Sequence, residues 1–366
     1  MKALKLVIPL LLVVIVVGVS QLCITLQASD SNNSGSSMTM AQPQACAGDS
    51  LDTEIEPAEG NLLAGDYPSM YDTDSQLSLI APGDPDIDKQ WALTSLQISS
   101  LWQTTTGSQE VLVAILDTGI DGDHEDLIGQ IAGEVNLTDS PIAGDIYGHG
   151  THIAGIIAAG DNDTGVVGVA PGCRLLNVKV ADDRGRCDAS NLADGIVWAV
   201  DNGVGVINIS IEIKESSPDL EEAVQYAWDN GALIIAAAGN SGSQNPVYPA
   251  YYEECIAVAA VKEDNSLAPL TNRGDWVDLV APGFKIYSTL PDDSYGYESG
   301  TSFAAAHVSG IAALLFSVVA DANDNGRIND EVRAIIEAGC QDIGIDGTGK
   351  GCIDAAEISL PINQPL

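Results

Sequence analysis

One serine, Ser302, stands between a glycine turn and a long apolar run in the stretch Ser-Gly-Thr-Ser-Phe-Ala-Ala-Ala-His, residues 299–307. The uncharged run over residues 303–320 predicts a buried helix, so Ser302 is expected in its first turn. Free backbone N–H groups and the helix dipole favour negative charge there. A serine that attacks a carbonyl can use this position, because its own N–H helps to hold the developing oxyanion. The alternative is a serine that only caps the helix.

Two further residues have types that could activate such a serine. His149 lies in Gly-His-Gly-Thr-His, where the flanking glycines allow close approach of backbone or substrate. A histidine at the start of a helix can accept a proton from serine and pass it on. Asp117 follows the apolar run 111–116 and precedes a Thr-Gly turn. A strand-end aspartate of this kind is often only a turn residue.

Asn240 lies in the glycine-rich turn Ala-Gly-Asn-Ser-Gly, residues 238–242. An asparagine there can be a left-handed turn residue, or it can direct its side-chain N–H at an oxyanion. The alternation of apolar runs and amphipathic stretches indicates the elements that would position these residues.

Buried strands are predicted at 111–116, 175–180, 204–209, 233–238 and 256–261. Helices are predicted at 91–102, 151–159, 189–202, 219–230 and from about 330. This alternation predicts an α/β fold with a mostly parallel central sheet and helices on both faces. The carboxyl ends of the strands would carry the site, and both Asp117 and Asn240 follow such ends.

The other histidines are given structural interpretations. His152 could pair with His149 on a metal, but no HExxH pattern or third soft ligand accompanies them. We therefore predict that His152 faces inward. His124 falls in a loop and His307 within the serine helix.

The order Asp117, His149, Ser302 is the order of the subtilisin-type triad. With these motifs in register, the chain resembles the subtilases, the subtilisin-like serine proteases of family S8, and is most similar to their thermitase group. The stretches 245–252 and 281–283 are similar to that group in particular.

The resemblance runs from about residue 84 to 356 and implies a subtilisin-like three-layer fold and a serine endopeptidase. It implies Ser302 as nucleophile, His149 as general base and Asp117 as the residue that orients the imidazole. Asn240 and the Ser302 N–H would form the oxyanion hole, and polypeptides would be cleaved through an acyl-enzyme.

The same resemblance implies a substrate strand at Ser210, Ile211 and Glu212, with Gly185 and Arg186 on the facing edge. An extended peptide would add as a strand between them. Glu212 stands where the family commonly has glycine. We expect it to narrow or charge the first specificity pocket, which would favour a basic or small residue before the cut.

A structural calcium ion is implied by the resemblance. Hard oxygen donors suit Ca²⁺, and they are expected from Asp84, Asp126, Gly160, Asn162, Thr164 and Val166. A second candidate loop contains Asp321, Asn323 and Asn325 and looks like the front half of an EF-hand. Its twelfth position is Val332, and Glu331 comes one residue early. A solvated acidic loop is therefore the alternative.

The serine motif departs from the family pattern at Phe303, Ala305 and Ala306, where methionine, threonine and proline are usual. The lost hydroxyl lies near the oxyanion hole, and the lost proline changes the constraint on the first helical turns. Two alternatives follow: a weak or inactive binding protein on a subtilase frame, and a peptide ligase that transfers the acyl group to an amine.

Composition limits the partners and the compartment. The 52 acidic residues against 14 Lys and Arg argue against nucleic acid, because phosphate repels such a surface. Of the seven cysteines, six remain if Cys23 leaves with a targeting segment, an even number that suits disulfides in an exported protein. Cys340 and Cys352 are the expected pair.

Residues 1–27 carry two lysines and then an apolar run, which predicts an export signal or an uncleaved membrane anchor. Residues 28–80 read as a disordered acidic linker or a short pro-segment. The catalytic domain is expected over 81–360, followed by a tail at 361–366. These features predict a secreted or extracytoplasmic protein with a monomeric catalytic domain.

Overall fold

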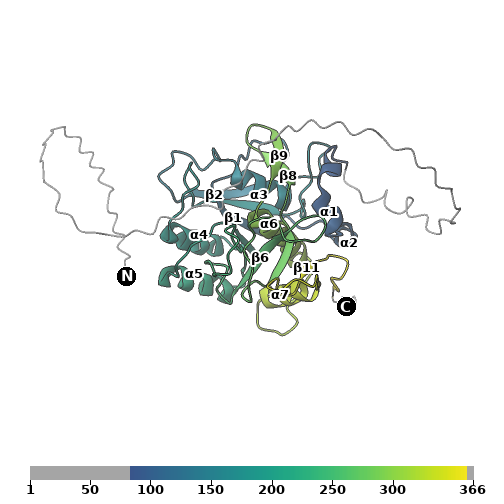
Figure 1. The fold of residues 1–366 in the computed structure, drawn as a ribbon. Helices are drawn as coiled ribbons and strands as arrows, with labels where there is room; N and C mark the ends of the chain where they lie inside the picture. Colours follow the sequence, from purple (N-terminus) through teal and green to yellow (C-terminus); the bar gives the residue numbers. More distant parts are fainter. Residues whose placement is uncertain (1–82, 361–366) are drawn as a thin grey trace, which may run out of the picture. The chain divides into compact units, whose positions relative to one another are not determined.

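The computed structural model describes residues 83–360, so the predictions for 1–27, 28–80 and 361–366 lie outside the described residues (Figure 1). A nine-stranded sheet has the order β10-β11-β7-β6-β5-β4-β1-β3-β2. Its neighbours run parallel except β10 and β11. The strands are β1 (Leu112–Asp117), β2 (Ile131–Asn136), β3 (Arg174–Lys179), β4 (Val206–Ile209), β5 (Leu233–Ala237), β6 (Cys255–Val261), β7 (Leu279–Pro282), β10 (Cys340–Gln341) and β11 (Cys352–Ile353).

A separate antiparallel hairpin pairs β8 (Ile286–Leu290) with β9 (Ser294–Glu298). Three helices alternate with the strands between β2 and β5, and helices cover the sheet (Figure 1). They are η2 (Ile87–Lys89), α1 (Trp91–Ser95), α2 (Ser99–Trp102), α3 (His149–Ala158), α4 (Ala189–Asp201), α5 (Pro218–Asp229), α6 (Thr301–Phe316) and α7 (Asn329–Ala338).

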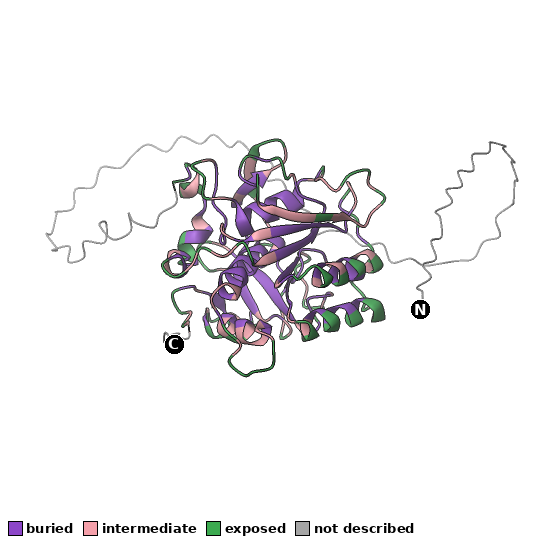
Figure 2. Ribbon diagram, turned by 180° about the vertical axis from the view of Figure 1, so that it is seen from behind, coloured by how far each residue is buried: buried purple, intermediate pink, exposed green. Residues whose placement is uncertain are grey.

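The strands are buried on both faces, which explains their continuous apolar runs. In β1, Val113 and Ile115 pack into the cluster that holds α3, α6 and α7. Ala114 and Leu116 point the other way, into the cluster that holds α4 and α5. The strands are buried while the outward faces of α4 and α5 are exposed (Figure 2). The predicted three-layer α/β fold is therefore confirmed.

Helix α6 is buried along almost its whole length, with every residue from Thr301 to Leu315 buried. It contacts β4, β5, β6 and β7 on one side of the sheet and α3 beside it. It begins two residues before the predicted start and ends at Phe316 rather than 320. Ser302 lies in its first turn, as predicted.

The helix predicted over 91–102 is wrong as a single element, because the chain forms α1 and α2 with a break between them. Gln97 has a positive φ of 53°, a conformation that a continuous helix cannot accommodate. Its side-chain amide donates to both carboxylate oxygens of Asp354, at 2.9 and 2.8 Å. A contact with a residue so distant in sequence stabilises the break.

The predicted disulfide between Cys340 and Cys352 is not formed, and both residues are free thiols. In the antiparallel pair, Cys340 lies opposite Ile353 and Cys352 lies opposite Gln341. Directly opposed residues share a face, so this register directs the two cysteine side chains to opposite faces. Sequence proximity alone did not reveal that one-residue offset.

No helix within residues 83–360 combines the length and the apolar character needed to cross a bilayer.

Gly310 tests the packing of α6. A Cβ atom built at Gly310 would lie 2.5 Å from Cβ of Val169. Alanine raises helix propensity by about 1 kcal/mol relative to glycine, but forcing a methyl into a packed core costs about 1–3 kcal/mol. We expect Gly310→Ala to lower the free energy of unfolding, measured by urea denaturation in a Ser302→Ala background. Glu222→Ala, on the exposed face of α5, is the control. A Gly310→Ala variant more stable than its parent would contradict the close packing.

Candidate active site

Asp117 and His149 form a buried pair at the carboxyl end of β1. Asp117 is the last residue of β1 and fully buried, and His149 is the first residue of α3. Nδ1 of His149 lies 2.9 and 3.0 Å from the two carboxylate oxygens. The backbone N–H of Thr118 also donates to Asp117 Oδ1, at 2.7 Å. Because a carboxylate only accepts, Nδ1 carries the proton and Nε2 keeps its lone pair.

The surroundings of His149 favour its protonated form. Burial opposes the charge, but the charge and hydrogen bond of Asp117 outweigh it, and the pKa of His149 is raised. Asp145 and Glu298 add smaller contributions in the same direction. An imidazole in this environment can hold a proton taken from a neighbouring hydroxyl.

Ser302 lies in the first turn of α6 with 1% of its surface exposed. Its Oγ has no hydrogen-bond partner in the described part of the chain. The ring of the next residue, Phe303, lies 5.5 Å from the ring of His149. The start of α6 and the start of α3 therefore meet. Contacts between a nucleophile and its base are commonly loose before substrate binds.

Asn240 is oriented by the same helix. Its Oδ1 accepts the backbone N–H of Thr301 at 2.9 Å. An N–H donor fixes which end of the amide faces it, so the side-chain NH₂ group of Asn240 is directed elsewhere. The Nδ2 atom of Asn240 lies 3.2 Å from the position that a Cβ atom built on Gly300 would occupy. It is thus a free donor beside the first turn of α6, where Ser302 lies.

Asp145 was not singled out in the sequence, yet it joins the parts of this site. Its carboxylate accepts from the hydroxyls of Thr118 and Thr151, at 2.9 and 2.8 Å. It also accepts the backbone N–H groups of Gly148 and Thr151, at 2.8 and 2.9 Å. Asp145 therefore caps α3 and fixes the orientation of His149. An acidic residue just ahead of a predicted helix start was the available signal.

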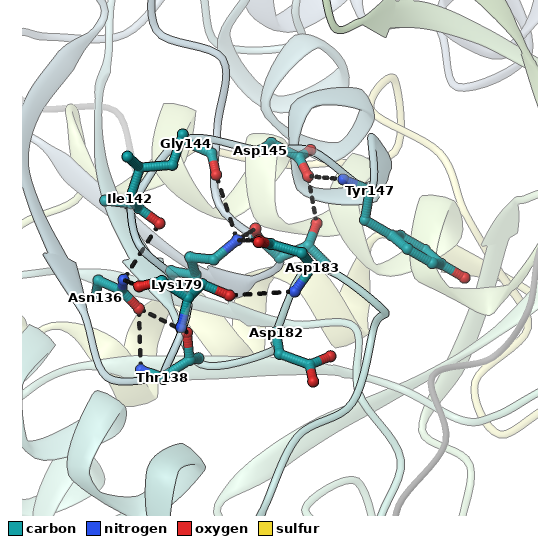
Figure 3. Close-up of polar contacts among 12 residues, drawn as sticks. Asn136, Thr138, Ile142, Gly144, Asp145, Tyr147, Lys179, Asp182 and Asp183 are labelled. Carbon is teal, nitrogen blue, oxygen red and sulfur yellow. Dashed lines mark hydrogen bonds and ion pairs between the residues drawn. The ribbon is translucent and has the colours of Figure 1, made fainter.

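Lys179 is a second residue that the sequence did not indicate. It is fully buried at the end of β3, and its ammonium pairs with Asp183 at 2.9 Å. The same group donates to the carbonyl oxygen of Thr118. It also donates to that of Gly144 (Figure 3). Lys179 lowers the pKa of Asp183. It links the turn after Asp117 to the loop that ends in Asp145.

The remaining histidines take the structural positions predicted for them. His152 and His307 are buried, and burial lowers the pKa of His152 to about 3 and that of His307 to about 4. His152 Nε2 lies 3.3 Å from the carbonyl oxygen of Gly296. His124 Nε2 lies 3.1 Å from that of Ser294.

The predicted substrate strand presents a free edge. The backbone groups of Ile211 and Glu212 make no hydrogen bond to any described residue. The segment is anchored at one end by Ser210 Oγ, which donates to the carbonyl of Ser302 at 3.2 Å. At the other end, Ile213 pairs with Tyr248.

The facing edge, where Gly185 and Arg186 were expected to pair with a peptide, is only partly free. The N–H and C=O of Arg186 both bond to Asp182, and its guanidinium forms two further bonds to the same carboxylate. Arg186 is thus held in a closed turn, and its backbone is not available to a peptide. Of the two expected residues, only Gly185 keeps a carbonyl without a donor in residues 83–360.

The predicted calcium loop places unsatisfied oxygens together. Asp84 and Asp126 are buried, and each has one carboxylate oxygen without a donor in the described chain. Their other oxygens accept backbone N–H groups of the loop, from Asn162 and Thr164 to Asp84 and from Val166 to Asp126. Burial raises the pKa of both carboxyls.

The carbonyl oxygens of Gly160, Thr164 and Val166 likewise accept no hydrogen bond from residues 83–360. This donor set of hard oxygens fits a calcium ion. A cluster of three or more His, Cys, Asp or Glu side chains arranged for a metal is absent from the described chain. The fit therefore rests on two carboxylates together with carbonyl oxygens.

The loop at residues 321–330 is different. Asp321 Oδ1 accepts the backbone N–H groups of Asn323 and Asn325, each at 3.2 Å. The side-chain amides of Asn323 and Asn325 donate to Asp330 at 2.8 and 2.9 Å. These groups bond to one another, whereas Asp330 Oδ1 and Glu331 Oε2 have no hydrogen-bond partner in the described chain. The second calcium site stays a prediction.

A buried Asp–His pair, an unpartnered serine at a helix start and a free amide donor beside it define a site of the serine hydrolase class. The model of the Subtilase family matches residues 108–344. Among known proteins, the chain is 44% identical over 251 residues to the thermophilic serine proteinase of Bacillus sp. (strain AK1). That match covers 68% of this chain and 60% of the relative.

Thermitase of Thermoactinomyces vulgaris is 39% identical over 281 residues, which cover 75% of this chain and 97% of thermitase. The major intracellular serine protease of Bacillus subtilis (strain 168) is 42% identical over 233 residues, 61% of this chain and 73% of that protein. The chain therefore belongs to the subtilase family, as a subtilisin-like serine endopeptidase of the thermitase group.

The histidine environments can be checked by NMR titration of the Ser302→Ala protein. We expect His149 to titrate above the ordinary value of about 6.5, and His152 and His307 to titrate near pH 3 and 4. Asp117→Asn should lower the pKa of His149. Because the folded-state pKa of His149 is raised, its pairing stabilises the fold below about pH 6.5, and this contribution is lost as pH rises through the folded-state pKa. A His149 pKa below 6.5 would mean that burial outweighs Asp117.

Proposed function

We propose that this protein hydrolyses peptide bonds of extended polypeptides through an acyl-enzyme on Ser302. The observation that carries this proposal is the Asp117–His149 pair, which leaves Nε2 of His149 free where the first turns of α3 and α6 meet. Asp117 holds the ring in the productive tautomer and stabilises the imidazolium.

In the first half-reaction, Ser302 Oγ bonds to the scissile carbonyl carbon while His149 Nε2 takes the hydroxyl proton. The carbonyl oxygen becomes an oxyanion held by the Asn240 NH₂ group and the Ser302 N–H. The C–N bond then breaks, and His149 gives its proton to the departing amine. In the second half, His149 removes a proton from water, water attacks the ester, and Ser302 recovers its proton.

The substrate would be held as an added strand. Backbone N–H and C=O groups at Ile211 and Glu212 are free, and a peptide can pair with them as with a sheet edge. The carbonyl of Gly185 is the remaining group on the facing side. Main-chain pairing of this kind requires an extended polypeptide and is indifferent to most side chains.

Calcium is proposed as a structural ion held by Asp84, Asp126, the Asn162 side chain and the three loop carbonyls. When bound, it supplies positive charge to two buried carboxylates whose inward oxygens have no donor. Its place is between the N-terminal segment of the described chain and the loop after α3. We assign it no step of the chemistry.

We further propose export directed by residues 1–27, which are cleaved or retained as a membrane tether, followed by the acidic segment 28–80. The protein would act outside the cytoplasm as a monomeric catalytic domain on polypeptides, without nucleic acid. The location rests on those first residues, since the relatives include an intracellular protease by name.

Labelling of the full chain with a fluorophosphonate probe tests the nucleophile. We expect the parent to be labelled and Ser302→Ala to be unlabelled, because only an activated serine reacts. An unlabelled but folded parent would favour the alternative of a binding protein on the same frame. Supply of an amino-acid amide tests the peptide-ligase alternative, since ligation in place of hydrolysis would overturn the assignment to water.

Asn240→Ala tests the oxyanion donor. We expect kcat on a peptide substrate to fall by about 100- to 1,000-fold, the magnitude known for a subtilisin, while KM changes little. Ser241→Ala serves as the neighbouring control, because its side chain bonds to Asn272 and not to the site. A fall of less than about tenfold in Asn240→Ala would remove Asn240 from this role.

Calcium removal tests the metal site. With calcium at 100 to 1,000 times its Kd, binding adds about 3–4 kcal/mol, so chelation should lower the Tm by roughly 5–15 °C. Asp126→Asn should abolish this dependence, whereas the exposed Asp139→Asn should retain it. An unchanged Tm in EGTA, with no calcium uptake by calorimetry, would contradict the site.

A further inference from the structure

Glu212 is a half-buried carboxylate at the end of the proposed substrate strand. It follows Ser210 and Ile211, which are both buried, and precedes Ile213, which is tied to Tyr248. With Ser210 bonded to the Ser302 carbonyl on one side and Ile213 paired on the other, the backbone at Glu212 has little freedom. The Cα atom of Glu212 is therefore held in a fixed place relative to the nucleophile.

That side chain lies against the backbone that leads into Asn240. A Cβ built at Gly239 would be 2.2 Å from Glu212 Oε2, closer than real Cβ contacts allow. The carboxylate thus occupies the space that any side chain at 239 would need. Since Gly239 directly precedes Asn240, Glu212 is packed beside the proposed oxyanion hole.

The carboxylate forms no ion pair with a described residue, although the charge of Lys214 acts on it. Glu212 Oε2 is buried without a hydrogen-bond partner, and no ion pair in residues 83–360 includes Glu212. Arg186 on the facing turn is already paired with Asp182. Burial raises the pKa of Glu212, and the Asn240 N–H and the charge of Lys214 offset this only in part. A buried charge of this kind is costly until a cation joins it.

A bound peptide would bring a side chain to this place. The carbonyl held between Ser302 and Asn240 belongs to the residue before the cleaved bond, the P1 residue. If that peptide pairs with the free edge at 211–212, its P1 side chain extends between this edge and the turn at 239–240. Glu212 lies in that gap, with an oxygen that still needs a donor.

We propose that Glu212 selects a cationic P1 side chain, lysine or arginine, and that the endopeptidase cuts after basic residues. This inference rests on the proposed function and names its substrate class. An ammonium or guanidinium supplies the missing charge and donates to Oε2. An apolar P1 side chain of the same length would leave the carboxylate buried and unpaired.

The surroundings of the site support this choice. Glu298, the last residue of β9, also makes no ion pair or side-chain hydrogen bond within the described chain, and it acts on His149 in the direction of its protonated form. The site therefore holds two carboxylates, Glu212 and Glu298, that form no ion pair within residues 83–360. A positively charged substrate offsets their charge on binding.

The test compares peptides that differ only at P1, with lysine, arginine, norleucine, phenylalanine or glutamate. Lysine and norleucine have similar lengths, so the ratio of their kcat/KM values isolates the charge. We expect the parent to favour lysine by roughly 10- to 100-fold, as for a charge-assisted hydrogen bond, and Glu212→Gln to remove most of that preference. The control is Glu215→Gln, an exposed carboxylate nearby, which should keep the parental ratio.

A readout that needs no turnover complements the ratio. Benzamidine, an aromatic cation, should protect Ser302 of the parent from the fluorophosphonate probe and should protect Glu212→Gln much less. A parent that is labelled and cleaves best after phenylalanine or norleucine would overturn the inference while leaving the protease assignment intact. A parent that is neither labelled nor active on any peptide would overturn the proposed function, and this inference with it.

Discussion

The hydrogen bond between Asp117 and His149 is the constraint around which the rest of the structure is arranged. It joins the end of a buried strand to the start of a buried helix, and each partner has its own support. The N–H of Thr118 holds the carboxylate, and Asp145 caps the helix that carries the imidazole. A small shift of α3 against β1 would separate the pair, so the packing of both elements contributes to the chemistry.

The charged residues near the Asp117–His149 pair form an ion pair of their own. Lys179 places a positive charge under the turn at Thr118, while Asp183 on its far side neutralises it. The lysine therefore ties the loops together without cancelling the field of Asp117 at the imidazole. Partially offset charges of this kind let a buried site keep several carboxylates close to one histidine.

Local patterns sufficed to predict the layers, the parallel sheet and the positions of Asp117, His149, Asn240 and Ser302. Long apolar runs and glycine-rich turns are encoded over a few residues, and the family's motif order made their assembly clear. The edge strand β2 was missed because Gly133 and Glu134 interrupt its apolar pattern, and its pairing with β3 contains a register shift.

Other features depend on contacts between distant segments and could not be predicted. The break at Gln97 depends on Asp354, and the separation of the thiols of Cys340 and Cys352 depends on strand register. The closed turn at Arg186 depends on a carboxylate that sequence alone does not orient. Asp145 and Lys179 looked like ordinary charged residues until the fold brought their partners together.

The contacts of Asp84 have a consequence for how much of the N-terminus the protein can lose. Asp84 accepts the N–H groups of Asn162 and Thr164, and the N–H of Asp86 donates to Gly165. These few residues clamp the loop that follows the histidine helix, although they lie far ahead of it in sequence. Any trimming that creates a mature N-terminus must therefore stop before Asp84. A cut a few residues further would remove these hydrogen bonds and free the loop at the back of α3.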